Sequence, residues 1–490
     1  MDWSQSLRMS LTTALVVSVC IADSVTIAYD GSVMGSVNVM SSYSAYFSLD
    51  TATIAVNSTA VYLGAILIAP IAGMIVDKRG RKEAIAVSCV LNIIGAAISG
   101  AAQNIAMFIA GRMIIGLGMG LAQTAASAYV SETTAPKVRP LALGLYFSCW
   151  AIGGFLATGV CYGTQQMDPS DWAWRLPCLF QMFAPICVLF ILPFLPESPR
   201  WLIYNDRADE GLHVLARVNG TDVEHPSVQL QFQEIMDTLN YEKTEGQSLG
   251  FRTIIKNAPN RKRLYLCLSV APLTMLTGSN IITYYYGTML SQAGITSSKT
   301  QMEINLVLSA WQFVIACAGS VLAEGLGRRV LCLSSLGLCT IMFYAVGGMT
   351  AAYGTSSDTS GVYGTVAFIF LFMGAYSFGL TPLTNMYPPE VMSYNIRATG
   401  MAMFTLLAKA CGVFVTMVFP YMFEAIGWKT YMVNASWNIL FFIGVYFFWV
   451  ETKGKTLEEI DELFDGVKHS DVPDLVHLDD KSAAVVVQEV

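Results

Sequence analysis

The sequence predicts an all-α integral membrane protein in which twelve transmembrane helices form two pseudo-symmetric halves of six helices each. Charged residues make up only 13% of the 490 residues and hydrophobic residues 54%, whereas soluble domains carry about 25% charged residues. Apolar runs of about 20 residues, long enough to cross a bilayer as a helix, recur along the chain. The composition excludes a soluble enzyme, and a net charge of −7 without a basic face argues against a nucleic-acid partner.

A polar segment separates the sixth predicted span from the seventh. The first span is not expected to be a cleaved signal peptide, because its apolar stretch is longer than a signal core and eleven more spans follow. The predicted spans are 11–33, 55–76, 84–103, 106–129, 140–162, 174–195, 264–290, 303–324, 330–352, 363–386, 397–422 and 428–449.

The charge of the loops predicts their side of the membrane. Lysine and arginine gather after the even-numbered spans, and positively charged loops stay cytoplasmic. The chain is therefore divided into a cytoplasmic N-terminus (1–10), an N-terminal six-helix bundle (11–200), a cytoplasmic linker with short interfacial helices (201–262), a C-terminal six-helix bundle (263–450) and a cytoplasmic tail (451–490). The glycosylation sequon Asn57-Ser58-Thr59 is placed in the first outside loop.

Cysteine and histidine give no sign of a metal site. The eleven cysteines contain no C-x-x-C pair, and most lie inside apolar runs, where they are expected to behave as small apolar residues. The four histidines lie in polar segments, so no zinc site is expected in the membrane. No cofactor is expected.

Charged signatures of the first half return in the second half in the same order. Three matches occur at offsets of 247, 258 and 254 residues. They pair Asp77-x-x-Gly80-Arg81-Lys82 with Glu324-x-x-Gly327-Arg328-Arg329, Glu132 and Arg139 with Glu390 and Arg397, and Glu197 with Glu451. Duplicated halves around a central cavity are the architecture of many secondary transporters.

The same signatures carry a resemblance to a known family. The motifs are Gly73-x-x-x-Asp77-Lys78-Arg79-Gly80-Arg81-Lys82, Gly111-Arg112-x-x-x-Gly116, Pro196-Glu197-Ser198-Pro199-Arg200-Trp201-Leu202, and Glu451-Thr452-Lys453-Gly454-Lys455-Thr456. The chain resembles the sugar porter family of the major facilitator superfamily, over nearly its whole length. Within that family, Trp150, Asn305, Trp311 and Thr381-Pro382-Leu383 look like the fungal disaccharide permease branch.

The resemblance implies a major facilitator fold and secondary-active transport by alternating access, without catalytic residues. The expected substrate is a sugar or sugar-like solute imported with protons. The alternatives are a carrier of an anionic or specialised metabolite, such as a sugar acid, and a non-transporting nutrient sensor. The expected setting is the lipid bilayer of the plasma membrane, with the protein as a monomer.

The cytoplasmic charges are expected to form a gate. Ion pairs that exist in only one state bias a two-state equilibrium, and arginine can hold a carboxylate by two hydrogen bonds. We expect pairs across the two halves when the protein faces outward; the alternative is that these charges only anchor helix ends and fix topology. The candidates are Asp77, Arg81, Glu132, Arg139, Glu197, Arg200, Glu324, Arg328, Arg329, Glu390, Arg397 and Glu451.

Asp30 in the first span and Arg112 at the start of the fourth are expected to carry proton coupling, as the resemblance implies for an Asp and an Arg at these positions. Arginine favours the ionised carboxylate, whereas closure around a substrate favours protonation. The alternative is a permanent structural ion pair.

The resemblance also implies where the substrate binds. The candidates are Phe147, Trp150, Thr274, Asn280, Tyr284, Gln312, Asn385 and Lys409. Several depart from the family: Phe147 and Thr274 replace glutamines, and Asn385 and Lys409 replace aromatic residues. Lys409 is midway along the eleventh span and needs a partner or water. Three possibilities remain open: pairing with Asp23, binding a negative group of the substrate, and snorkelling to water.

Overall fold

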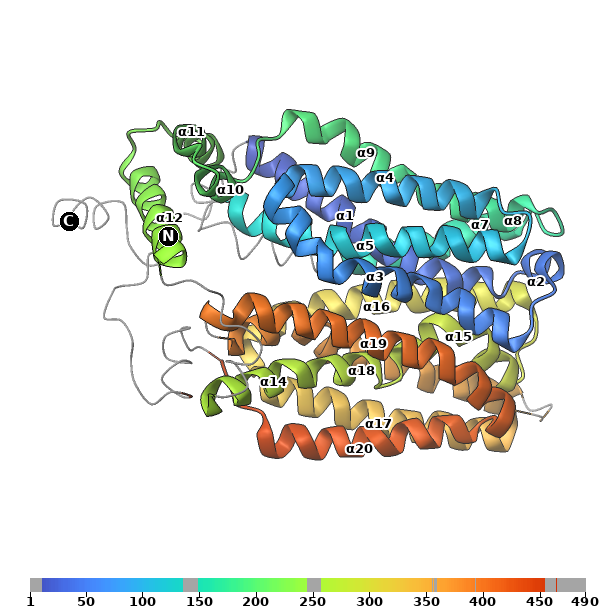
Figure 1. Cartoon of the computed structure of the whole chain (residues 1–490). Helices are drawn as coiled ribbons and strands as arrows, with labels where there is room; N and C mark the ends of the chain where they lie inside the picture. The colour runs from blue at the N-terminus through green and yellow to red at the C-terminus, as the bar shows by residue number, and fades with distance from the viewer. Residues whose placement is uncertain are drawn as a thin grey trace.

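A computed structural model describes residues 11–134, 149–244, 257–354, 356, 359–392, 394–453 and 464. Within this part the chain is helical and forms two bundles that lie side by side, the N-terminal bundle above the C-terminal one in Figure 1. Several predictions fall elsewhere. Arg139 and Phe147 lie outside the described residues, as do the segment 1–10 and most of the tail, and the side chains of Glu324, Asn385 and Arg397 are likewise outside the description.

The N-terminal bundle begins with a long helix followed by a short one. Polar side chains start two of its helices: Asp50 accepts a hydrogen bond from Thr53 N (2.8 Å), and Asn104 accepts one from Met107 N (2.8 Å). The helices are α1 (Leu11–Val37), α2 (Ser41–Phe47), α3 (Thr51–Arg79), α4 (Arg81–Gly100), α5 (Ile105–Thr133), α7 (Trp150–Gln165), α8 (Trp172–Phe180), α9 (Phe183–Ile191) and the 3₁₀ turn η1 (Leu192–Phe194).

The C-terminal bundle begins with a broken helix. Its first span consists of α14 (Ala258–Met275) and α15 (Ser279–Gln292), with a break over residues 276–278. The remaining helices are α16 (Ser298–Leu326), α17 (Arg328–Tyr353), α18 (Thr359–Val391), α19 (Tyr394–Ile426) and α20 (Lys429–Phe448).

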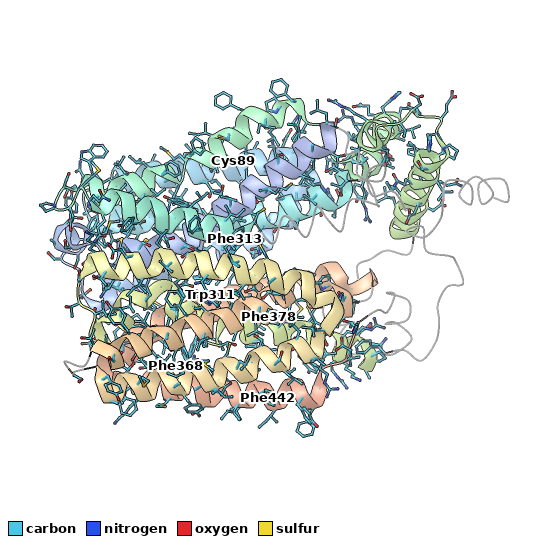
Figure 2. The ribbon with its side chains drawn as sticks, turned by 180° about the vertical axis from the view of Figure 1, so that it is seen from behind. Cys89, Trp311, Phe313, Phe368, Phe378 and Phe442 are labelled. Atoms are coloured by element: carbon cyan, nitrogen blue, oxygen red, sulfur yellow. The ribbon has the colours of Figure 1, made fainter. Side chains whose placement is uncertain are left out.

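The helices confirm a multi-pass membrane protein. Within the described residues, eleven segments are long and apolar enough to cross a membrane. The predicted fifth span is described only from its middle onward, where α7 lies. Large apolar side chains project from the outside of both bundles (Figure 2). Such a surface suits contact with lipid rather than water.

Short helices follow the first bundle, as predicted for the linker. They are α10 (Pro199–Tyr204), α11 (Ala208–Asn219) and α12 (Pro226–Thr244), at the left of Figure 1. Hydrogen bonds attach them to the N-terminal bundle; among them, Thr13 Oγ1 donates to Val218 O (2.9 Å), and Trp201 Nε1 donates to Asp77 O (2.7 Å).

The expected position of the sequon is wrong. Asn57 lies within α3 rather than in a loop, is fully buried, and donates a hydrogen bond to the Tyr43 hydroxyl. Its amide is therefore not accessible for glycosylation in the folded protein. All eleven cysteines fall in the described part of the chain; they are free, and most are buried.

Candidate functional site

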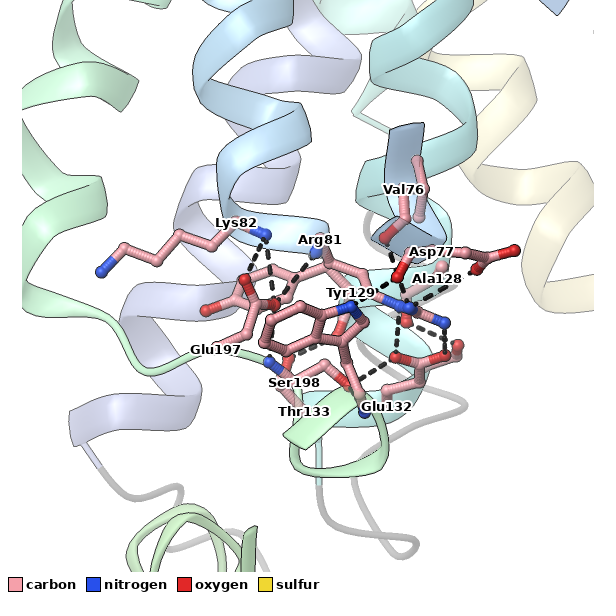
Figure 3. A network of polar contacts seen from close by, with 12 residues as sticks. Val76, Asp77, Arg81, Lys82, Ala128, Tyr129, Glu132, Thr133, Glu197 and Ser198 are labelled. Atoms are coloured by element: carbon pink, nitrogen blue, oxygen red, sulfur yellow. Dashed lines mark hydrogen bonds and ion pairs between the residues drawn. The ribbon is translucent and has the colours of Figure 1, made fainter. Parts of the chain in front are cut away.

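A polar network joins three helix ends of the N-terminal bundle at the end nearer the linker helices. Arg81 is the first residue of α4. Its Nε lies 2.9 Å from Glu132 Oε2, and its Nη2 donates a hydrogen bond to Glu132 Oε1 (3.0 Å). A longer contact of 3.6 Å reaches Asp77 at the end of α3. Ser198 donates its hydroxyl hydrogen to the same Glu132 carboxylate. The network ties α3, α4 and α5 to the segment before α10 (Figure 3).

Glu197 occupies the N-terminus of α4. Its carboxylate accepts hydrogen bonds from the backbone N–H groups of Arg81 (3.0 Å), Lys82 (3.1 Å) and Ser198 (2.8 Å). The first N–H groups of a helix lack partners within it and carry a partial positive charge. Partial burial raises the pKa of Glu197, and these N–H bonds oppose that rise. Glu197 is therefore the cap of α4.

The C-terminal bundle repeats this arrangement. Arg328, at the start of α17, donates to both oxygens of Glu390 (2.9 and 3.2 Å), and Thr452 donates to Glu390 (2.6 Å). Glu451 accepts from the backbone N–H groups of Arg328 (2.8 Å) and Arg329 (3.0 Å). Each residue has its counterpart in the first network, at the spacing that the sequence repeat predicts.

Among the described side chains, the ion pairs of Arg81 and Arg328 lie within one half, and pairing across the halves in the outward-facing state stays a prediction. Arg81 pairs with Glu132 and Arg328 with Glu390, so each of these ion pairs joins residues of one half. Both arginines lie one residue after a glycine that turns the chain into a helix, and each faces the acid at the end of the neighbouring long helix. Arg200 lies in the short α10.

Val450 of the second network occupies the position that Pro196 has in the first. Tyr129 donates its hydroxyl hydrogen to Pro196 O (2.6 Å), and the corresponding Tyr387 contacts Val450 O (3.1 Å). Proline has no N–H group, whereas Val450 N also donates to the Tyr387 hydroxyl oxygen (3.3 Å). Val450 thus keeps the contact that the proline makes and adds a donor.

A buried ion pair lies inside the N-terminal bundle. Arg112 Nη1 of α5 is 2.6 Å from Asp30 Oδ1 of α1, and the two side chains are 1% and 2% exposed. Arg112 Nη2 also donates to Asp30 O (3.3 Å). Asp30 Oδ2 is buried and has no hydrogen-bond partner among the described residues. The predicted pair is therefore present, with one carboxylate oxygen available to a proton.

A group of side chains connects this pair to the C-terminal bundle. The Tyr284 hydroxyl lies beside Gly31, next to Asp30, and donates to the Tyr62 hydroxyl of α3 (3.1 Å). Lys409 Nζ of α19 lies 6.0 Å from the centroid of the Tyr62 ring. The structure thus brings together Asp30, Tyr284 and Lys409 from the predicted residues and adds Tyr62, which sequence reasoning missed.

The break between α14 and α15 forms a second polar group. Tyr376 donates to Thr274 O (2.8 Å), and Asn280 donates to Met275 O (3.0 Å). Three side chains of α20 supply the other donors: Asn434 and Trp437 bond Leu276 O (2.9 and 2.8 Å), and Asn438 bonds Thr277 O (2.9 Å). Inside a membrane, backbone carbonyls that a helix break leaves without an intrahelical donor need hydrogen-bond donors from other side chains. The α20 residues were not predicted; the pair of asparagines one turn apart in an apolar span was their signal.

Two predicted substrate residues stand apart from these groups. Trp150 begins α7 and is 42% exposed. Gln312 is half-buried in α16. None of the hydrogen bonds described for the two polar groups involves them.

The halves touch each other through their outer parts. The hydroxyls of Thr59 (α3) and Thr416 (α19) lie 2.8 Å apart, and Asn305 (α16) donates to Ser36 (α1) over 3.2 Å. Since α1 and α19 end outside in the predicted topology, these contacts lie toward the outer face.

Comparisons with known proteins agree with this architecture. Residues 15–464 match the family model described as "Sugar (and other) transporter". The MFS-type transporter criB of Aspergillus cristatus is 30% identical over 398 residues, which are 80% of this chain and 81% of that protein. A high-affinity glucose transporter of Kluyveromyces lactis is 30% identical over 416 residues, 79% of this chain and 73% of that protein. The xylose transporter XylE from E. coli, solved in a partially occluded inward-open conformation, superposes with a TM-score of 0.76 at 18% identity, covering 91% of this chain and 100% of that one.

Proposed function

The chain belongs to the sugar transporter family of the major facilitator superfamily, and on that premise we propose that it carries a sugar or sugar-like solute across the membrane together with protons. It works by alternating access rather than by covalent chemistry. The proposed setting is the plasma membrane, with both termini in the cytoplasm. Placement in the fungal disaccharide branch stays a prediction.

The Asp30–Arg112 pair carries the proposal of proton coupling. Both side chains are buried, and in the described part of the chain nothing bonds Asp30 Oδ2. Protonation of Asp30 removes the charge that compensates Arg112, and a buried charge without a partner is costly. The pair therefore favours different surroundings in its two protonation states. Tyr284 of the other half lies beside Gly31, next to the pair, and bonds Tyr62 of α3, so those surroundings include the interface between the halves.

The two cytoplasmic networks support movement of each half as a unit. The first ties the ends of α3, α4 and α5 to the segment that leaves its bundle, through Glu132 and Ser198. The second ties those of α17 and α18 to the corresponding segment, through Glu390 and Thr452. Bundles held in this way can rock against each other around a central site, which is the usual form of alternating access. The role of these charges as a gate is thus proposed to act through helix ends within each half.

Uptake in cells that lack their own carriers tests this proposal. A panel of labelled sugars, sugar acids and polyols is measured with and without an uncoupler, at verified surface expression. We expect at least one solute to accumulate above its outside concentration, and the uncoupler to collapse that accumulation. If the protein takes up none of these solutes, the result would favour a non-transporting sensor. Accumulation that resists the uncoupler would contradict proton coupling.

A further inference from the structure

Lys409 lies on the face of α19 that contacts the other half. Lys409, Gly412 and Thr416 follow at positions i, i+3 and i+7, which share one face of a helix. Thr416 bonds Thr59 of α3, and a Cβ added to Gly412 would collide with the ring of Tyr62. The next residue on this face toward the cytoplasm is Lys409, whose ammonium lies over the same ring. Lys409 therefore belongs to the face of α19 that contacts α3 of the other half.

The ammonium of Lys409 has no carboxylate partner among the described side chains. The predicted partner Asp23 is a buried residue of α1, and no ion pair joins it to Lys409. Asp23 follows Cys20 by one turn, and Cys20 contacts Ala126 O of α5 inside the N-terminal bundle. Asp30 is engaged by Arg112. Lys409 is half-buried, and the contact described for its ammonium is with the face of the Tyr62 ring.

The charges of the central group therefore do not balance. Two cations, Arg112 and Lys409, accompany one ionised carboxylate, Asp30. A charge near a helix centre in the membrane costs about 2.5–3.5 kcal/mol on insertion scales and is kept where a partner or a function compensates it. The remaining positive charge is that of Lys409, which lies over the ring of Tyr62. The Tyr62 hydroxyl bonds that of Tyr284, and both hydroxyls are of the kind that can bond sugar hydroxyls.

Resting on the proposed function, we propose that the substrate is an acidic sugar and that Lys409 binds its carboxylate. Lys409 forms an ion pair with the carboxylate, while the Tyr62 and Tyr284 hydroxyls bond the sugar ring. Proton binding to Asp30 leaves Arg112 without its partner and makes the site more positive. The proton and the anion thus favour each other's binding, which is the coupling that symport requires.

The proposal has an electrical consequence. One carboxylate substrate carried with one proton moves no net charge, whereas a neutral sugar carried with one proton moves one positive charge. A membrane potential of about 100 mV, inside negative, can raise the inside concentration of a solute that moves with one positive charge to roughly 40 times the outside concentration. It adds no driving force to transport of the acidic sugar.

Transport of D-glucuronate and D-glucose by the full-length protein in proteoliposomes tests this inference. The two probes differ only at C6, which carries a carboxylate in one and a hydroxymethyl group in the other. Lys409→Met removes the charge, Lys409→Arg keeps it, and Lys429→Met removes an exposed lysine at the start of α20 as a matched control. Thermal unfolding of each purified variant provides the folding check.

We expect the wild type to prefer glucuronate and to import it at a rate independent of an imposed potential. Lys409→Met should lower glucuronate uptake at least ten-fold relative to glucose, Lys409→Arg should restore much of the preference, and Lys429→Met should leave it unchanged. If Lys409→Met transports glucose and keeps the wild-type preference for glucuronate over glucose, the inference is overturned and the proposed function stands. Transport of no sugar or sugar acid by the wild type would overturn the proposed function, and the inference with it. If Lys409→Met does not fold, Lys409→Gln is measured in its place. Loss of the preference for glucuronate in that variant supports the inference, and an unchanged preference overturns it.

Discussion

Glu197 and Glu451 hold equivalent positions in the two halves, since each carboxylate accepts hydrogen bonds from the first backbone N–H groups of a long helix, α4 or α17. A glycine precedes each helix: Gly80 has φ +93° and Gly327 has φ +91°. A Cβ at either glycine would run into the glutamate carboxylate. The duplication in the sequence therefore preserves a complete unit of glycine, capped helix and glutamate.

The first prediction follows from these glycines. Gly80→Ala and Gly327→Ala should each destabilise the protein by about 1–3 kcal/mol, because the backbone conformation is nearly exclusive to glycine. Thermal unfolding in detergent measures the loss. Gly73→Ala is the control, since a Cβ there meets no atom within 4 Å. Equal melting temperatures for all three variants would contradict the proposed cap geometry.

Double-mutant cycles separate pairing within a half from pairing between halves. Residues in contact show coupling energies, whereas distant ones are additive within about 0.3–0.5 kcal/mol. We expect Arg81→Ala with Glu132→Ala to give a coupling of about 1 kcal/mol or more, and Arg81→Ala with Glu390→Ala to be additive. Unfolding free energies of the single and double variants provide the cycle. A larger coupling in the second pair would restore the cross-half gate as the dominant arrangement.

The α14–α15 break depends on donors from α20. Asn438→Leu leaves Thr277 O without its hydrogen bond, and an unpaired buried carbonyl costs about 1–3 kcal/mol. We expect lower folded yield and a lower melting temperature. Ser436→Ala, two residues away at an exposed bond to Tyr344, should have a small effect. Equal effects of the two substitutions would mean that the break is not supported from α20.

The contact between Thr59 and Thr416 should set the balance between conformations. Thr59→Val removes a buried hydroxyl pair that joins the halves near the outside. A hydrogen bond contributes about 0.5–1.5 kcal/mol, so we expect a shift of roughly 2- to 10-fold toward outward-open molecules. Distances between spin labels placed on the outer ends of α3 and α19 report these populations. An unchanged distribution would show that the contact does not favour outer closure.

Much of the fold could be predicted because hydropathy and loop charge are local properties. The spans, the linker helices and the repeat of charged residues all follow from short stretches of sequence. The partners of Glu197 could not be predicted in the same way, since they are backbone N–H groups that every residue except proline carries. The sequence indicated that Arg81 needs an acid but not which half supplies it.

Depth along a helix was an insufficient guide to side-chain partners. Asp23 and Lys409 lie at similar depths in their spans, yet depth does not determine which face of a helix carries a residue. The face of α1 near Asp23 packs inside its own bundle, whereas Lys409 faces α3 across the interface. Tyr62 was missed because one tyrosine in an apolar span gives no distinctive signal. The Asp30–Arg112 pair was predicted because few charged residues lie within the spans, so an acid can be assigned to a base with few alternatives.

Proton movement coupled to substrate is the most direct test of the account. A pH indicator enclosed in proteoliposomes records the interior when a substrate from the uptake panel is added outside, for the wild type and for Asp30→Asn. We expect the wild type to acidify the interior on addition of substrate. Asp30→Asn should give no acidification while still exchanging labelled for unlabelled substrate. Acidification of equal size in Asp30→Asn, or uptake by the wild type without acidification, would contradict proton symport through Asp30.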